Sequence, residues 1–188
     1  MTRMISIFRG RQVVFLGVTC YLLSFLFGLI TPGISMNVFD SEKEVVTRRV
    51  DDLKVPKGLV KKIFVNNLGL NAIIISGAFS LMAFSGIILL FNGLQIGYVV
   101  NGLSKVYGLK LAFLLIGPHL FVELVSHILS LYLAYLILVE IIVPLVMNYE
   151  LINVSKSGLI KMASLLAGIV ILTFLGAFVE VNVTPLLI

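Results

Sequence analysis

Two histidines and a glutamate recur at helical spacing within a long apolar stretch, namely His119, Glu123 and His127. Residues four apart on a helix project from the same side, so these side chains would face a common neighbour. Imidazole and carboxylate groups are ordinary zinc ligands. The metalloprotease motif His-Glu-x-x-His has a different spacing, and three ligands from one helix segment would crowd a single ion. We therefore predict a hydrogen-bonded cluster without a metal or cofactor, and the alternative is a metal site of these three residues.

Amide side chains form a second group of polar residues in apolar sequence. Asn67 and Asn71 share a helix face, and Asn92 directly precedes the pattern Gly93-x-x-x-Gly97. Amides hydrogen-bond between membrane helices, and small residues four apart let two helices approach closely. A local helix break at Asn92 would expose backbone groups that its side chain can bind.

The last apolar stretch ends with Glu180 and Thr184, which are four residues apart and precede Pro185. Charged side chains are rare at membrane depth and usually face protein or water. The predicted intramembrane polar cluster consists of His119, Glu123, Asn67, Asn71, Asn92 and Glu180. The residues predicted to serve helix packing are Gly93, Gly97, Pro118, Thr184 and Pro185.

The elements that carry these residues must lie in lipid. The chain has 188 residues, of which 60% are hydrophobic and 12% charged, whereas a soluble domain has about 25% charged residues. The composition excludes a soluble enzyme, a nucleic-acid-binding protein and a disordered linker, although the net charge is +5. We predict an all-α, polytopic transmembrane helical bundle that forms a single integral membrane domain over residues 1–188.

Long uncharged stretches mark the expected spans. The first runs from Val13 to Thr31, and the last from Gly158 to Phe178. Between them, Phe64 to Ser104 carries no charge and would make a helix about 60 Å long, about twice the hydrocarbon thickness of a bilayer. A further apolar stretch from Leu111 to Val143 is interrupted early by Gly117-Pro118.

Two architectures are compatible with these stretches. The chain could fold back near Ser85-Gly86, which gives about five spans. Alternatively, four spans are joined by a re-entrant hairpin at residues 92–117, which requires protein or a watery cavity around it. Counting Lys and Arg favours an outside N-terminus, whereas the arginines before the first span favour the reverse, so the orientation stays open.

Residues 34–62 form a polar loop between the first two apolar stretches. Ser41-Glu42-Lys43-Glu44 fits a capping box, in which a hydroxyl and a carboxylate bind the first free amides of a helix. Val46, Val50 and Leu53 follow at helical spacing. The segment is either an amphipathic helix on the membrane surface or a solvated connector.

Taken in order, four motifs resemble those of the stage II sporulation protein M family. The resemblance covers about residue 61 to the end of the chain. It rests on Asn66-Asn67, Asn92-Gly93-x-x-x-Gly97, Pro118-His119-x-x-x-Glu123 and Glu180-x-x-x-Thr184-Pro185. The chain has Leu120 where family members commonly have glycine.

The resemblance implies a five-span bundle and favours that architecture over the hairpin. The family's namesakes act in spore engulfment with cell-wall-degrading partners, and other relatives accompany bacteriocin production beside transporters. We therefore expect a non-enzymatic protein of the cell membrane, a scaffold or transport-associated subunit. Its expected partners are the lipid bilayer and other membrane or envelope proteins, or further copies of itself, but no nucleic acid. The alternative is a transporter or channel whose polar path is lined by Glu123, His119 and Glu180.

Overall fold

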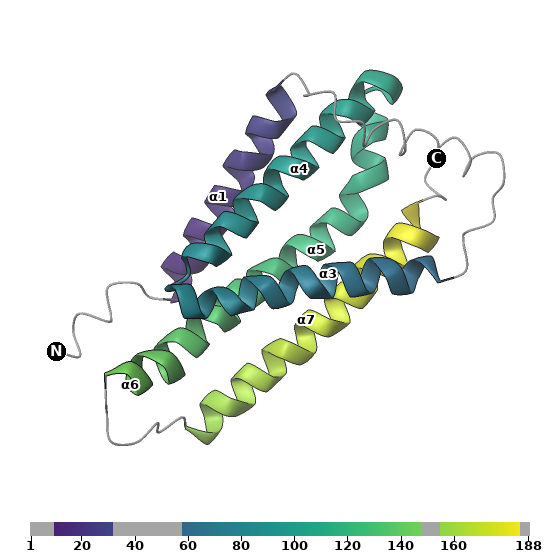
Figure 1. Cartoon of the computed structure of the whole chain (residues 1–188). Helices are drawn as coiled ribbons and strands as arrows, with labels where there is room; N and C mark the ends of the chain where they lie inside the picture. Colours follow the sequence, from purple (N-terminus) through teal and green to yellow (C-terminus); the bar gives the residue numbers. More distant parts are fainter. Residues whose placement is uncertain (1–9, 32–57, 148–154, 185–188) are drawn as a thin grey trace.

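The computed structural model describes residues 10–31, 58–147 and 155–184, and the regular structure within these ranges is helical (Figure 1). Five helices are long and apolar enough to cross a membrane, which confirms the predicted fold class. Three of the spans are single helices, namely α1 (Gly10–Ile30), α4 (Ala83–Tyr107) and α7 (Lys156–Asn182). The other two are composite. Helix α3 (Leu59–Ser76) continues into the 3-10 turn η2 (Gly77–Ser80), and α5 (Leu109–Ile137) continues into the π-helical η3 (Leu138–Ile142) and α6 (Val143–Val146). Most of the polar loop 34–62 and the residue Pro185 lie outside the described ranges.

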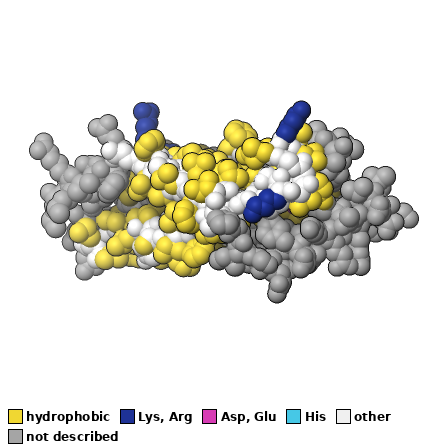
Figure 2. All heavy atoms as spheres, turned by 90° about the horizontal axis from the view of Figure 1, so that it is seen from above, with side chains coloured by type: hydrophobic (Ala, Val, Ile, Leu, Met, Phe, Trp, Pro, Cys, Tyr) yellow, Lys and Arg dark blue, Asp and Glu magenta, His cyan; other side chains and the backbone are white. Residues whose placement is uncertain are grey.

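The outer surface of the bundle is apolar. Large hydrophobic side chains such as Phe15, Phe79 and Phe121 are more than two-thirds exposed. Figure 2 shows a face of the molecule that is mostly hydrophobic, with scattered basic side chains. Such a surface would be unstable in water and is suited to lipid, because acyl chains solvate apolar groups.

The chain reverses between α3 and α4 at Leu81 and Met82, slightly earlier than the predicted Ser85-Gly86. These two residues have positive φ angles of 52° and 71°, and the Met82 amide donates to the Gly77 carbonyl at 2.9 Å. The Ser85 hydroxyl donates to the Ile74 carbonyl at 2.7 Å. The first turn of α4 is therefore already held against the last turn of α3, and the reversal must precede it.

The alternative with a re-entrant hairpin at residues 92–117 is wrong. Helix α4 continues without a break through Asn92 to Tyr107. The chain then reverses at Gly108, where φ is 81°, a conformation that glycine adopts without steric cost. The expected interruption at Gly117-Pro118 is also absent, because Pro118 lies inside α5. A membrane helix tolerates such a proline where neighbouring groups replace the lost hydrogen bond.

Helix α5 lies at the centre of the bundle and contacts α1, α3, α4 and α7. Helices α1 and α4 run side by side (Figure 1). Apolar side chains fill the interior in three clusters. Their buried members are Tyr21, Ile74, Leu89 and Leu131; Leu133, Leu136, Met162 and Ile169; and Val100, Ala112 and Ile116.

Candidate functional site

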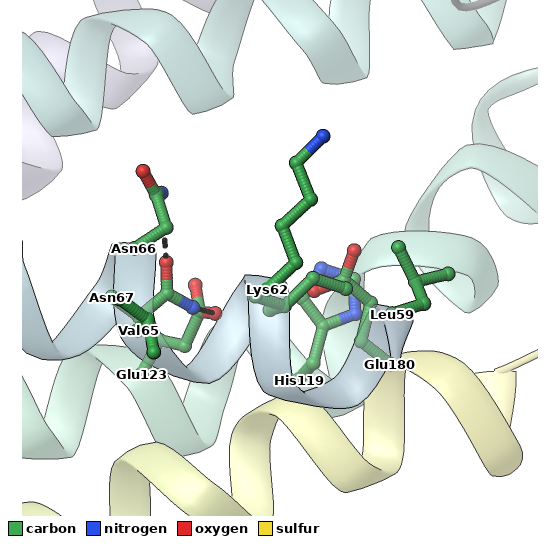
Figure 3. Close-up of a pocket in the computed structure, with 9 residues that line it drawn as sticks. Leu59, Lys62, Val65, Asn66, Asn67, His119, Glu123 and Glu180 are labelled. Carbon is green, nitrogen blue, oxygen red and sulfur yellow. Dashed lines mark hydrogen bonds between the residues drawn. The ribbon is translucent and has the colours of Figure 1, made fainter. Parts of the chain in front are cut away.

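The predicted polar residues are divided between two neighbouring places in the bundle. Asn67, His119, Glu123 and Glu180 line a cavity among the first turns of α3, the first half of α5 and the end of α7 (Figure 3). Asn71 and Asn92 instead belong to a buried network. The two places are linked along α3, because Asn67 and Asn71 lie one helical turn apart.

The buried network is built around the Asn71 side chain, which is fully buried. Its amide nitrogen donates to the Thr173 hydroxyl on α7 at 2.9 Å and to the Ser126 hydroxyl on α5 at 3.3 Å. Its amide oxygen accepts from the Ser130 hydroxyl at 2.8 Å. One side chain of α3 is thus hydrogen-bonded to both α5 and α7.

His127 connects this centre to α4. Its Nδ1 lies 3.0 Å from the Asn71 amide oxygen, and its Nε2 lies 2.6 Å from the Asn92 amide nitrogen. An amide oxygen only accepts and an amide nitrogen only donates, so these two contacts assign the proton to Nδ1 and make Nε2 an acceptor. The imidazole is therefore neutral and has both nitrogens occupied.

The hydroxyl groups of the network also form hydrogen bonds to backbone carbonyls of their own helices. Ser126 and Thr173 donate to the carbonyls of Glu123 and Ile169, at 2.8 and 2.7 Å. The single hydroxyl proton of Ser130 is shared between the Asn71 amide oxygen at 2.8 Å and the Ser126 carbonyl at 2.9 Å. Each of these hydroxyls thus has an acceptor, and the network carries no net charge. Buried polar groups with all partners in place rigidify a core, whereas a group without one is costly. We name these six residues the interior network: Asn71, Asn92, Ser126, His127, Ser130 and Thr173.

The cavity on the neighbouring turn is more polar and more open. Its volume is about 600 Å³, and it is lined by Leu59, Lys62, Ile63, Val65, Asn66, Asn67, His119, Glu123 and Glu180. Within it the Asn67 amide donates to a Glu123 carboxylate oxygen. Asn66 in turn donates to the Asn67 amide oxygen at 3.4 Å (Figure 3).

His119 and Glu180 complete the polar lining from α5 and α7. The Nδ1 atom of His119 is buried and has no hydrogen-bond partner within the described residues. Glu180 lies close enough to Glu123 for the two carboxylates to repel each other when both are ionised. Lys62 supplies the basic group among the lining residues. The cavity can therefore bind polar groups through donors, acceptors and charges of both signs.

The cavity ends at the interior network. Ser126 and His127 lie one turn beyond Glu123 on α5, and Asn71 lies one turn beyond Asn67 on α3. Past the network come buried apolar residues, including Ile74 and Ile169. Within the described ranges, the polar lining therefore stops part of the way through the bundle.

The metal alternative of His119, Glu123 and His127 does not assemble. Although the three residues share one side of α5, His127 binds Asn71 and Asn92, whereas His119 and Glu123 line the cavity. In the part of the chain that the structure describes, no group of three His, Cys, Asp or Glu side chains is positioned to hold a metal ion.

Of the residues predicted to serve helix packing, Gly93 and Gly97 lie at the contact of α4 with α1. A Cβ atom at Gly97 would lie 2.8 Å from the Leu29 backbone nitrogen, and one at Gly93 would lie 3.3 Å from that of Phe25. The backbone of α1 thus packs directly against both glycines. Thr184 is buried, and its hydroxyl donates to the Val179 carbonyl at 3.3 Å.

Several residues of the site were not predicted. Thr173 gives no signal in the sequence, because a single threonine in an apolar helix usually bonds to its own backbone. Ser126 and Ser130 are four residues apart, on either side of His127 in the sequence. This spacing would have predicted that both serines share a helix face close to His127. Gly28 is the α1 partner of the glycine pair, and a Cβ atom there would lie 3.1 Å from the Gly97 Cα.

Apolar helices joined by an interior polar network define an α-helical, multi-pass integral membrane protein. The chain matches the family model of Stage II sporulation protein M over residues 13–185 and belongs to that family. The match begins in α1, so it covers more of the chain than the motifs from residue 61 onward. No curated protein and no solved structure is significantly similar to the chain.

Proposed function

We propose that the protein is a non-enzymatic subunit of the cell membrane that works by assembling with other membrane or envelope proteins, as a scaffold or beside a transporter. The observation that carries this proposal is the closed end of the cavity. A solute path needs polar or wet surface throughout the membrane. Here the polar lining meets a buried hydrogen-bonded network and then apolar residues such as Ile74 and Ile169.

The interior network also favours an assembly role. It joins α3, α4, α5 and α7 through neutral hydrogen bonds, and α4 is packed against α1 through glycines. A bundle fixed in this way holds one shape, so its outer faces keep a constant geometry for a partner. Transport by alternating access instead requires one part of the bundle to move against another.

Purification of the full chain from its native membrane in a mild detergent tests the proposal. We expect a stoichiometric partner or a defined oligomer. An unrelated five-span protein, expressed to the same level and purified in the same way, is the control for detergent-induced association. A strictly monomeric protein without a partner, in the native membrane as well as in detergent, would contradict the assembly role.

A transporter or channel is the second candidate, and a specific observation favours it. Glu123, His119 and Glu180 line one cavity, and ionisable groups within a membrane often mark ion or proton pathways. If the bundle opens beyond the interior network, these residues would form the entrance of the path.

Flux measurements in liposomes distinguish the two candidates. Proton flux is followed with a trapped pH dye and potassium flux with a trapped indicator, for the wild type and for Glu123→Gln. The glutamine keeps the size of the side chain and an oxygen for Asn67 but removes the charge. Lys161→Gln is the matched control, because Lys161 bonds to the Tyr132 hydroxyl on α5 and does not line the cavity. Background flux in all three proteins would exclude transport of these ions.

A further inference from the structure

Gln95 is a polar side chain on the outside of the bundle at the middle of a membrane helix. It is exposed and lies equally far along α4 from Ala83 and from Tyr107, with about 18 Å of helix on either side. A glutamine side chain is far too short to reach water over that length. Its amide therefore lies at the depth of the acyl chains.

The Gln95 amide has no hydrogen-bond partner among the described residues, unlike other polar side chains on the outer faces. The hydroxyls of Thr19 and Ser164 donate to the carbonyl one turn earlier, in each case at 2.8 Å. Lipid chains offer no hydrogen bonds, and leaving an amide unsatisfied in hydrocarbon is costly. The position of Gln95 thus calls for a partner from outside this bundle.

Gln95 is part of an outward-facing stripe on α4, which we name the outer α4 stripe: Phe84, Ile87, Phe91 and Gln95. These residues recur at spacings of three and four and so share one side of the helix. The three apolar members are 46%, 47% and 60% exposed. The opposite side of α4 carries Gly93 and Gly97, which are already occupied by α1. Among the described residues, the stripe is therefore the side of α4 that faces away from α1 and out of the bundle.

We propose that the outer α4 stripe binds the same stripe of a second copy of this chain, with the two Gln95 amides hydrogen-bonded to each other. The inference rests on the proposed assembly role and names the partner. A carboxamide both donates and accepts, so two of them related by a twofold axis exchange a pair of N–H···O bonds. A twofold contact brings together the same patch of both subunits, and the stripe contains no charge that would repel its own copy.

The location of Gln95 on the stripe also suits a symmetric contact. Its midpoint position in α4 lets two parallel helices cross at the amides. Phe91 and Ile87 then cover one side of the amide pair, which excludes lipid from the polar contact. Interhelical polar contacts stabilise helix pairs in membranes, so losing the pair should weaken dimerisation about tenfold or more.

The test compares the oligomeric state of the wild type, Gln95→Leu and Asn182→Leu, each purified as the full chain in mild detergent and measured by light scattering. Asn182 is the matched control, because it is an exposed amide at the end of α7 that bonds to the Phe178 carbonyl. We expect dimers for the wild type and Asn182→Leu, and a dissociation constant at least about tenfold higher for Gln95→Leu. Equal dissociation constants for all three proteins would overturn the proposal.

Disulfide cross-linking in native membranes provides a second readout. Replacing Cys20, the one cysteine of the sequence, by Ala gives a background for Gln95→Cys and for Leu166→Cys on the lipid-facing side of α7. We expect an oxidised dimer of the chain with itself for Gln95→Cys but not for Leu166→Cys. Cross-linking of position 95 only to a different protein would overturn self-association while supporting the assembly role. An isolated monomer would overturn both.

Discussion

Asn71 and His127 are the central residues of the interior network. The number of hydrogen-bond donors and acceptors on each side chain explains the contacts that it makes. The amide of Asn71 has two donors and an oxygen with two lone pairs, and the structure fills these with Thr173, Ser126, His127 and Ser130. His127 then needs one donor at Nε2, which Asn92 supplies. No ionised group is required, so the network suits a region without water.

Replacing Asn71 by Leu should lower the stability of the bundle by about 1–3 kcal/mol, because the His127 and Thr173 side chains would lose their common partner in a buried region. Asn66→Leu is the matched control, since Asn66 is an exposed amide of the same helix whose hydrogen bond to Asn67 is long at 3.4 Å. Thermal unfolding in detergent, followed by circular dichroism, measures both. Equal melting temperatures would show that the network does not stabilise the fold.

The contact between α1 and α4 depends on glycines. The backbone of α1 at Phe25 and Leu29 approaches Gly97 so closely that no side chain fits between them. Backbone atoms cannot rotate away as a side chain can, so a substitution here must separate the helices. The same approach lets the Asn101 amide donate to the Thr31 carbonyl at the end of α1, at 2.8 Å.

Gly97→Leu should therefore destabilise the bundle by about 1–3 kcal/mol or more, as overpacking does in well-packed cores. Gly86→Leu in the same helix is the control, because a Cβ atom built at Gly86 has no atom of a neighbouring helix within 4 Å. Relative to glycine, leucine raises helix propensity there by up to about 1 kcal/mol. We expect lower thermal stability for Gly97→Leu and unchanged or higher stability for Gly86→Leu. The reverse order would refute the close α1–α4 contact.

Five crossings place the ends of successive helices on alternating sides of the membrane. The cavity lies at the side where α3 begins, α5 begins and α7 ends. The start of α1 lies at the opposite side, where Gly10 contacts Tyr132 and Tyr135 near the end of α5. Within the described ranges, the cavity therefore lies toward one side of the membrane.

Cysteine accessibility should report this alternation. In a Cys20→Ala background, Lys105→Cys and Lys110→Cys flank the α4–α5 turn and should react with a membrane-impermeant thiol reagent from one side. Leu81→Cys and Ser155→Cys lie at exposed positions of the other ends and should react only from the opposite side. Labelling of intact cells and of inverted vesicles gives the two patterns. Reaction of Lys105→Cys and Leu81→Cys from the same side would contradict five spans.

The amino-acid sequence determined the lipid environment of the helices, because hydropathy is a local quantity, but it left five spans and four spans with a re-entrant hairpin both open until the family resemblance favoured five. A stretch without charge from Phe64 to Ser104 must lie in lipid or in a core, and its length exceeds one crossing. The position of the reversal was harder to predict, since the positive φ angles of Leu81 and Met82 accompany a contact across the turn, the hydrogen bond from Ser85 to Ile74, that no local pattern shows. Pro118 likewise looked like a break, although α5 continues through it.

The division of the polar residues was decided only by the tertiary structure. Spacing places His119, Glu123 and His127 on one side of a helix, and this is correct, yet it does not specify which neighbour each side chain meets. The packing of α3 and α4 against α5 directs His127 to Asn71 and Asn92, whereas Glu123 meets Asn67 in the cavity. Helical periodicity fixes directions within one element, but hydrogen-bond partners depend on the relative placement of several, which no local pattern contains.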